Sequence, residues 1–143
     1  GAGGSVGIGF AVPSNTAKRI IPDLLKYGYV RRPWLGVEPI PTVYLRRLGL
    51  DIPEGMLISR VVRGATAAKA GMRGATRQVV VGRYQVPWGG DILTHVNQQP
   101  VRTMEELAAQ IETRKAGEVI TLDYIRDNRK ESVKATLVLR PRS

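Results

Sequence analysis

Residues 32–37 of this chain read Arg32-Pro33-Trp34-Leu35-Gly36-Val37, and they set its organisation. The glycine permits a turn, and the successive backbone N–H groups then lead into a short strand that we expect at Trp34–Glu38. A nest of such amides binds an anion, especially a carboxylate, without any charged side chain. On spacing alone, however, packing of Trp34 and Leu35 in a core explains the same residues better.

The chain ahead of this stretch predicts one strand and one helix. Residues of Gly1–Val12 alternate between apolar side chains and Gly or Ala, which indicates a strand that Pro13 ends. Apolar residues at helical spacing then predict a helix over Asn15–Gly28, with a kink near Pro22. These two elements are too small to own a core. We therefore expect residues 1–30 to complete a domain of a longer protein, and residues 31–143 to form a second domain.

The chain after Pro33 predicts several short strands and helices without a repeating βαβ order. Strands are expected at Gly55–Val62, Gln78–Val81, Ile92–Val96, Val119–Arg126 and Ser132–Leu139, and helical segments at Thr42–Leu48 and Ala65–Ala70. A third helix begins at Thr103, which has Glu106 three residues later in a capping-box pattern. Its residues Met104, Leu107, Ala108 and Ile111 share one apolar face. This pattern is typical of an α+β domain.

The composition excludes several kinds of site. The 143 residues include no cysteine and one histidine, so disulfides, thiolate metal sites and pairs of imidazoles are excluded. That histidine, His95, lies in an expected strand, and the serines lack an activating neighbour in the sequence. Glu105 and Glu106 are adjacent, so they do not share a helix face. The sequence thus predicts no catalytic residue, no metal, no cofactor and no membrane span.

The net charge of +10 is concentrated in the middle of the chain. Residues 31–103 hold eleven basic against four acidic residues. The basic residues occur singly or in pairs such as Arg46/Arg47, and aromatic residues make up only 6% of the chain. A nucleic-acid site is therefore not favoured, because it lacks a stacking platform. An anionic partner, either a nucleic acid or an acidic protein, remains an alternative.

Five sequence segments resemble one protein family in the right order. They are Gly7-Ile8-Gly9-Phe10-Ala11-Val12-Pro13-Ser14, the helix Asn15–Gly28, Arg32–Val37, Gly64–Met72 and Gly90–Val101. Together they resemble the C-terminal part of an HtrA/DegP-type serine protease, from the end of its chymotrypsin-like domain through a PDZ domain. Gly64–Met72 departs from the family's G-S-P-A-x-x-A-G-L pattern at Ala65, Thr66 and Met72. The resemblance implies a PDZ-like, partly open β-barrel or sandwich of short strands with two to three helices, preceded by a strand and helix left from a protease barrel.

The same resemblance implies a binding function for this chain. The family's catalytic His, Asp and Ser would precede Gly1, so we expect the fragment to be inert although its parent resembles a serine endopeptidase. The amides of Leu35, Gly36 and Val37, next to Trp34, would take a peptide's terminal carboxylate. Leu35, Val37, Leu107 and Ile111 would surround its last side chain, and Met104 and Ala108 would contact residues further in. The implied partners are unfolded-protein C-termini and the parent protease domain, in protein quality control outside the cytoplasm, as in the periplasm.

Three features leave further expectations. Arg73–Gly89 is inserted where most family members have a few residues, and it fits a surface decoration better than a partner contact. Pro39 has no N–H two residues after Val37, so peptide pairing along this strand should be short. The strand Gly4–Val12 has an unpaired edge that could join two copies into a homo-oligomer.

Overall fold

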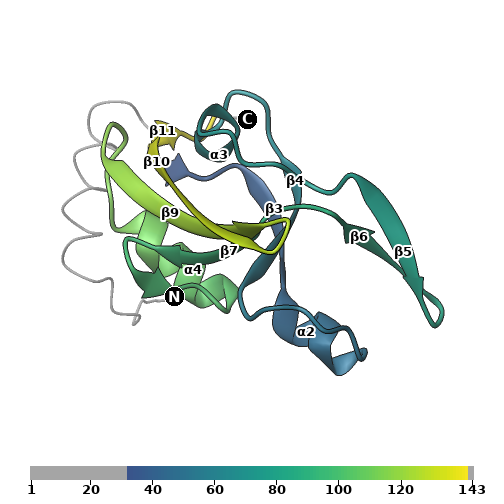
Figure 1. The fold of residues 1–143 in the computed structure, drawn as a ribbon. Coiled ribbons are helices and arrows are strands. Elements are labelled where there is room, and N and C mark those ends of the chain that lie inside the picture. Colours follow the sequence, from purple (N-terminus) through teal and green to yellow (C-terminus); the bar gives the residue numbers. More distant parts are fainter. Residues whose placement is uncertain (1–31, 142–143) are drawn as a thin grey trace, which may run out of the picture. The chain divides into compact units, whose positions relative to one another are not determined.

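An antiparallel sheet runs through residues 32–141, which are the part of the chain that the computed structural model describes (Figure 1). Its strand order is β10-β9-β7-β4-β3, and the short β8 pairs with β7. In chain order these strands are β3 Val37–Pro41, β4 Met56–Val61, β7 Ile92–Val96, β8 Gln99–Pro100, β9 Val119–Arg126 and β10 Arg129–Thr136. The strand and helix predicted before residue 30 lie outside the described residues.

Two smaller sheets and three helices complete the described part. β2 (Pro33–Trp34) pairs with β11 (Val138–Leu139), and β5 (Arg77–Val81) pairs with β6 (Tyr84–Trp88). The helices are α2 (Thr42–Arg47), α3 (Thr66–Lys69) and α4 (Met104–Glu112). The predicted α+β class is confirmed.

The core lies between the sheet and the helices α3 and α4. Leu107 and Ile111 of α4 pack on the sheet in a cluster of buried residues. The other members are Leu35, Met56, Ile58, Ala67, Met72, Leu93, Val96, Val101, Ile120, Leu122, Tyr124, Ala135 and Leu137. A second cluster joins α2 to the β5–β6 hairpin through Leu45, Ile52, Leu57 and Val86. The apolar face predicted for the third helix is thus partly a core face.

The structure divides two of the predicted strands. Trp34–Glu38 was expected as one strand, but Leu35 and Gly36 separate β2 from β3, because Gly36 has a left-handed φ of 73°. Ser132–Leu139 is likewise divided, because Leu137 turns into the core between β10 and β11. In both cases a residue breaks the alternation that the sequence pattern suggests.

The inserted segment Arg73–Gly89 contains a hairpin of which the sequence predicted only one strand. Gly82-Arg83 connect β5 to β6, with Gly82 at a φ of 61°. Glycine at the first central position of a two-residue turn is typical of type II′ hairpins. The second strand was not predicted because it contains Pro87, and proline is depleted in strands and confined to the edge strands of sheets.

Candidate functional site

A groove opens between β3 and α4, and all eight residues predicted for the site line it. Its volume is about 230 Å³. The predicted residues along it are Trp34, Leu35, Gly36, Val37, Met104, Leu107, Ala108 and Ile111. Its walls come from segments roughly 70 residues apart in the chain, so only the tertiary fold brings them together.

The loop at the end of the groove, residues 34–36, has its carbonyl groups hydrogen-bonded to the elements behind it. The Trp34 carbonyl accepts a hydrogen bond from the Thr66 hydroxyl at 2.6 Å. The Leu35 carbonyl accepts from the N–H of Ala67 at 2.9 Å, and the Gly36 carbonyl from the N–H of Val62 at 2.7 Å. Three consecutive peptide groups are therefore held in place by the elements behind them.

This anchoring determines where the loop's N–H groups point. In a planar trans peptide the N–H is directed opposite to the C=O of the preceding residue. The N–H groups of Leu35, Gly36 and Val37 therefore point away from Thr66, Ala67 and Val62. Within residues 32–141, those of Leu35 and Gly36 make no hydrogen bond. The loop thus presents backbone donors of the kind that can bind a carboxylate.

Gly36 is required for this arrangement by both its backbone and its surroundings. Its φ of 73° is a conformation that L side chains rarely adopt. A Cβ atom at this position would collide with the Cβ of Ala65. Glycine therefore allows the loop to pass close to the start of α3, whose residues hold the loop's carbonyls.

The first turn of α4 is capped as the sequence predicted. The Thr103 hydroxyl accepts a hydrogen bond from the N–H of Glu106 at 3.0 Å. The Glu106 carboxylate accepts from the N–H of Arg102 at 2.8 Å, rather than from Thr103 as in a full capping box. Hydrogen bonds from the Arg102 guanidinium lower the pKa of Glu106 to about 2, and the bond from the Arg102 backbone N–H is the second largest cause. These contacts fix the helix end that carries Met104.

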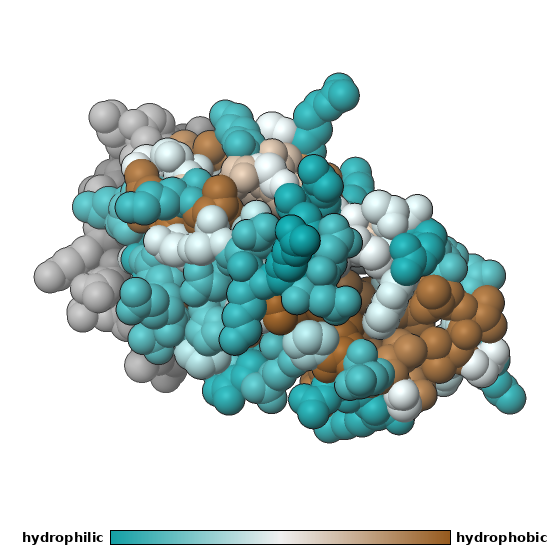
Figure 2. Space-filling view, viewed as in Figure 1, coloured by the Kyte–Doolittle hydropathy of each residue, from teal (hydrophilic) through white to brown (hydrophobic). Residues whose placement is uncertain are grey.

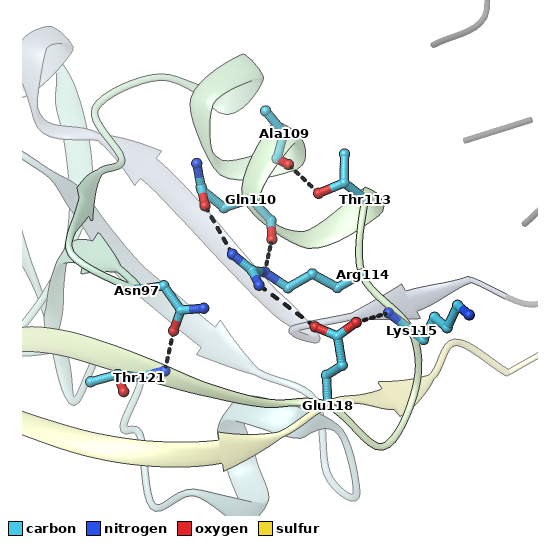
Figure 3. Close-up of polar contacts among 8 residues, drawn as sticks. All are labelled: Asn97, Ala109, Gln110, Thr113, Arg114, Lys115, Glu118 and Thr121. Atoms are coloured by element: carbon cyan, nitrogen blue, oxygen red, sulfur yellow. Dashed lines mark hydrogen bonds and ion pairs between the residues drawn. The ribbon is translucent and has the colours of Figure 1, made fainter. Parts of the chain in front are cut away.

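The last turn of α4 is tied to the sheet by polar contacts (Figure 3). The Arg114 guanidinium donates to the Gln110 carbonyl at 2.6 Å and lies 3.6 Å from the Glu118 carboxylate. Glu118 also accepts from the N–H of Lys115 at 3.1 Å. Figure 3 shows the Arg114 side chain folded back between the helix end and Glu118, next to β9. The groove is therefore built between two anchored walls.

Charged residues at the edge of the groove were not predicted for the site. Arg32, Arg140 and Glu112 line it, together with Pro33 and Pro39. The Arg140 guanidinium lies over the Trp34 ring, 5.6 Å from its centre, and the backbone N–H of Arg140 donates to the Arg32 carbonyl at 2.7 Å. The β2–β11 pairing brings them together across more than 100 residues. No local signal in the sequence indicates Arg140, which lies outside the basic region 31–103.

The groove wall formed by β3 is an edge strand of the sheet. Pro39 lies in this strand and lines the groove, and the register of β3 against β4 shifts between Glu38 and Pro39. The Gly36 carbonyl and the Thr42 N–H bond on the β4 side, which places the Pro39 nitrogen on the open edge. Because alternate residues of a strand face the same neighbour, the donor after Val37 on the open edge is the one that Pro39 lacks.

His95 lies on β7, away from the groove-lining residues. Its Nδ1 atom is 2.9 Å from the Thr94 hydroxyl, and the nearby Asp123 carboxylate accepts from the Ser132 hydroxyl at 2.8 Å. In the described part of the chain these contacts do not place His95 between a serine and an acid. Among residues 32–141 no helix is long and apolar enough to cross a membrane.

Comparison with known proteins identifies similar chains. The family model described as PDZ domain matches residues 6–137. The chain is 32% identical over 137 residues to the periplasmic pH-dependent serine endoprotease DegQ of Escherichia coli strain K12, covering 94% of this chain and 27% of DegQ. It is 31% identical to the periplasmic serine endoprotease DegP of the same strain, covering 94% of this chain and 26% of DegP. The chain thus spans about a quarter of the length of these curated relatives.

A solved structure shows the same architecture. The HtrA-type protease AlgW with a decapeptide matches at a TM-score of 0.64 and 26% identity, over 99% of this chain and 40% of AlgW. AlgW with a tripeptide matches at a TM-score of 0.62. The expected PDZ-like fold is therefore confirmed.

Proposed function

The chain belongs to the PDZ domain family, and on that premise we propose that its groove captures C-terminal or extended hydrophobic segments of substrate proteins. The peptide's terminal carboxylate accepts hydrogen bonds from the amides of Leu35, Gly36 and Val37. Its last side chain enters the space between Leu35, Val37, Leu107 and Ile111. Met104 and Ala108 contact the residues before it.

The anchored loop supports this proposal most strongly. Its carbonyls are held by Thr66, Ala67 and Val62, so its donors are oriented before a ligand arrives. Preorganised donors lose little conformational entropy on binding, which favours affinity. The apolar walls supply the second component, because a buried Val, Leu or Ile side chain contributes roughly 1.5–3 kcal/mol.

We further propose that this module serves a serine endoprotease that acts in protein quality control in the periplasm. The printed names of DegQ and DegP describe periplasmic serine endoproteases, and the AlgW structures contain peptides. In this proposal the chain supplies substrate binding, and the catalytic His, Asp and Ser belong to the parent protease domain.

The direct experiment is a screen of a C-terminal peptide library against three proteins. They are the wild type, Ile111→Arg, and the control Ala109→Arg, which alters an exposed residue of the same helix that does not line the groove. We expect the wild type and Ala109→Arg to select the same hydrophobic C-termini, and Ile111→Arg to lose them. Equal binding by all three proteins would show that the groove assignment is wrong.

A further inference from the structure

The hairpin of β5 and β6, here called the arm, projects from the sheet with β5 on its outer side (Figure 1). One face of the arm is held against the domain from its base to the residue before the turn, because Val86 is buried in the cluster with Leu45, Ile52 and Leu57, and Val79, Val81 and Trp88 pack against that cluster. No residue of the arm lines the groove. The arm is therefore fixed on one face and does not form part of the proposed peptide site.

The turn and register of the arm determine which backbone groups face outward. Val81 pairs with Tyr84 across the two-residue turn, and Val79 with Val86. A two-residue turn makes the flanking pair a hydrogen-bonded one, and such pairs recur at every second residue. The N–H and C=O groups of Gln78 and Val80 therefore point away from β6. The N–H and C=O groups of Gln85 and the C=O group of Pro87 point away from β5.

The two edges of the arm differ in their capacity to pair. On β6, Pro87 stands at an outward position and has no N–H, which blocks further pairing. On β5, the outward residues Gln78 and Val80 are uncharged and pair with no strand among residues 32–141. The free edge of the main sheet at β10, by contrast, carries Arg129, Lys130, Glu131 and Lys134. Proline and charge are the usual protections of exposed edges, and β5 has neither at its centre.

The arm also exposes apolar surface. Val80 is 73% exposed, and Tyr84 of β6 is 56% exposed. Figure 2 shows hydrophobic residues gathered at the end of the molecule where Figure 1 places α2 and the arm. An uncharged, β-branched strand with a free edge and apolar neighbours is suited to pairing with another strand.

We propose that β5 pairs with β5 of a second copy of this chain, antiparallel about a two-fold axis at Val79, to form a four-stranded sheet from two arms. Gln78 of each copy then pairs with Val80 of the other, and each pair exchanges two backbone hydrogen bonds. The two Val79 side chains face each other at the axis. The interface is self-complementary, as a two-fold axis requires.

The charges select this register over its neighbour. With the axis at Val79, Arg77 of one copy lies opposite Val81 of the other. With the axis at Val80, Arg77 would lie opposite Arg83 of the other copy, and like charges directly opposite each other are destabilising. Because each arm carries Arg77 and Arg83, added salt should strengthen the association by screening their repulsion.

A single introduced cysteine tests the register, since the 143-residue chain has none. Val79→Cys should form an intermolecular disulfide under mild oxidation, because residues at a non-hydrogen-bonded pair approach closely enough for one. Val81→Cys is the matched control on the same face of the arm. Its two copies would lie four residues, or about 14 Å, apart along the strands. Equal cross-linking of both variants, or of neither, would overturn the proposal.

A proline pair tests the edge itself, by sedimentation equilibrium of the full chain. Val80→Pro removes a donor from the outward edge of β5, and Gln85→Pro makes the same change on the outward edge of β6. We expect Val80→Pro to raise the dimer dissociation constant at least about tenfold, and Gln85→Pro to leave it unchanged. Val80→Lys and Gln85→Lys provide the same comparison without a backbone change. A monomeric wild type, an association equally sensitive to both edges, or one that weakens with added salt would overturn the proposal.

Discussion

The side-chain hydroxyl of Thr66 donates to the carbonyl of Trp34 at 2.6 Å and accepts from the N–H of Val138 at 2.9 Å. One fully buried hydroxyl thereby joins the start of α3, the groove loop and the C-terminal strand β11. Thr66 stands where the resembled G-S-P-A-x-x-A-G-L segment has its proline. In this chain it holds the first of the loop's three anchored peptide groups.

Replacing Thr66 by valine should therefore affect both stability and binding. Thr66→Val keeps the shape but leaves the Trp34 carbonyl and the Val138 N–H without their partner, at a cost of about 2 kcal/mol in the free energy of unfolding. Peptide affinity should fall as well, because the Leu35 N–H is no longer oriented. Urea denaturation and peptide titration measure the two effects. Thr66→Ser, which retains the hydroxyl, should preserve affinity, and an equal loss in both variants would contradict this role.

Gly36 and Gly49 offer a matched comparison of backbone strain with steric conflict. Both have positive φ, 73° and 93°, but a Cβ at Gly36 would strike Ala65, whereas one at Gly49 meets nothing within 4 Å. Gly49→Ala should cost about 1 kcal/mol of stability and leave peptide binding intact. Gly36→Ala should cost more and weaken binding at least tenfold, because the loop must move. Isothermal titration calorimetry with one peptide measures its affinity for both variants. An intact affinity in Gly36→Ala would refute the loop's role.

Pro39 should limit how far a bound peptide pairs with β3. Pro39→Ala restores an outward N–H, which is expected to improve affinity roughly two- to tenfold for peptides that extend beyond their last few residues. Peptides truncated to those last residues should bind wild type and variant alike. A series of truncations measured on both proteins tests this. If wild-type affinity already falls steeply when distant residues are removed, Pro39 does not limit the pairing.

The lowered pKa of Glu106 predicts a specific response to acid. The Arg102 contacts bring this pKa from its ordinary 4.5 to about 2, so the folded state favours the carboxylate. The stabilisation is complete above pH 4.5 and is lost as the pH falls toward about 2. An NMR titration of the Glu106 carboxyl should give a midpoint of about 2, and Arg102→Gln should raise it. A wild-type midpoint at the ordinary value would mean that the pair does not persist in solution.

Local patterns predicted the two segments that form the groove walls, because each wall is a local feature. The Trp34–Val37 segment combines a glycine turn with a strand, and the face of α4 follows from helical spacing and a capping threonine. The resemblance then joined these two segments into one groove, and the structure places them together. That they bind a peptide is still a proposal.

Contacts across the fold were not predictable in the same way. Arg140 reaches the groove only because β11 pairs with β2, and that pairing depends on Leu137 leaving the strand pattern for the core. The strand β6 was missed because Pro87 argues against a strand unless its position on an outer edge is known. Neither the pairing nor the edge is encoded in local periodicity. The boundary near residue 30 and pairing through Gly4–Val12 remain predictions, since these segments lie outside the described residues.

The proposed function of the groove depends most directly on recognition of a free carboxylate by the loop amides. The decisive measurement is the affinity of one hydrophobic-ended peptide with a free C-terminus, compared with the same peptide as a C-terminal amide, on the full chain. We expect the free acid to bind at least tenfold more tightly, because hydrogen bonds to a charged group contribute about 1.5–3 kcal/mol. Equal affinity for the acid and the amide would contradict the account.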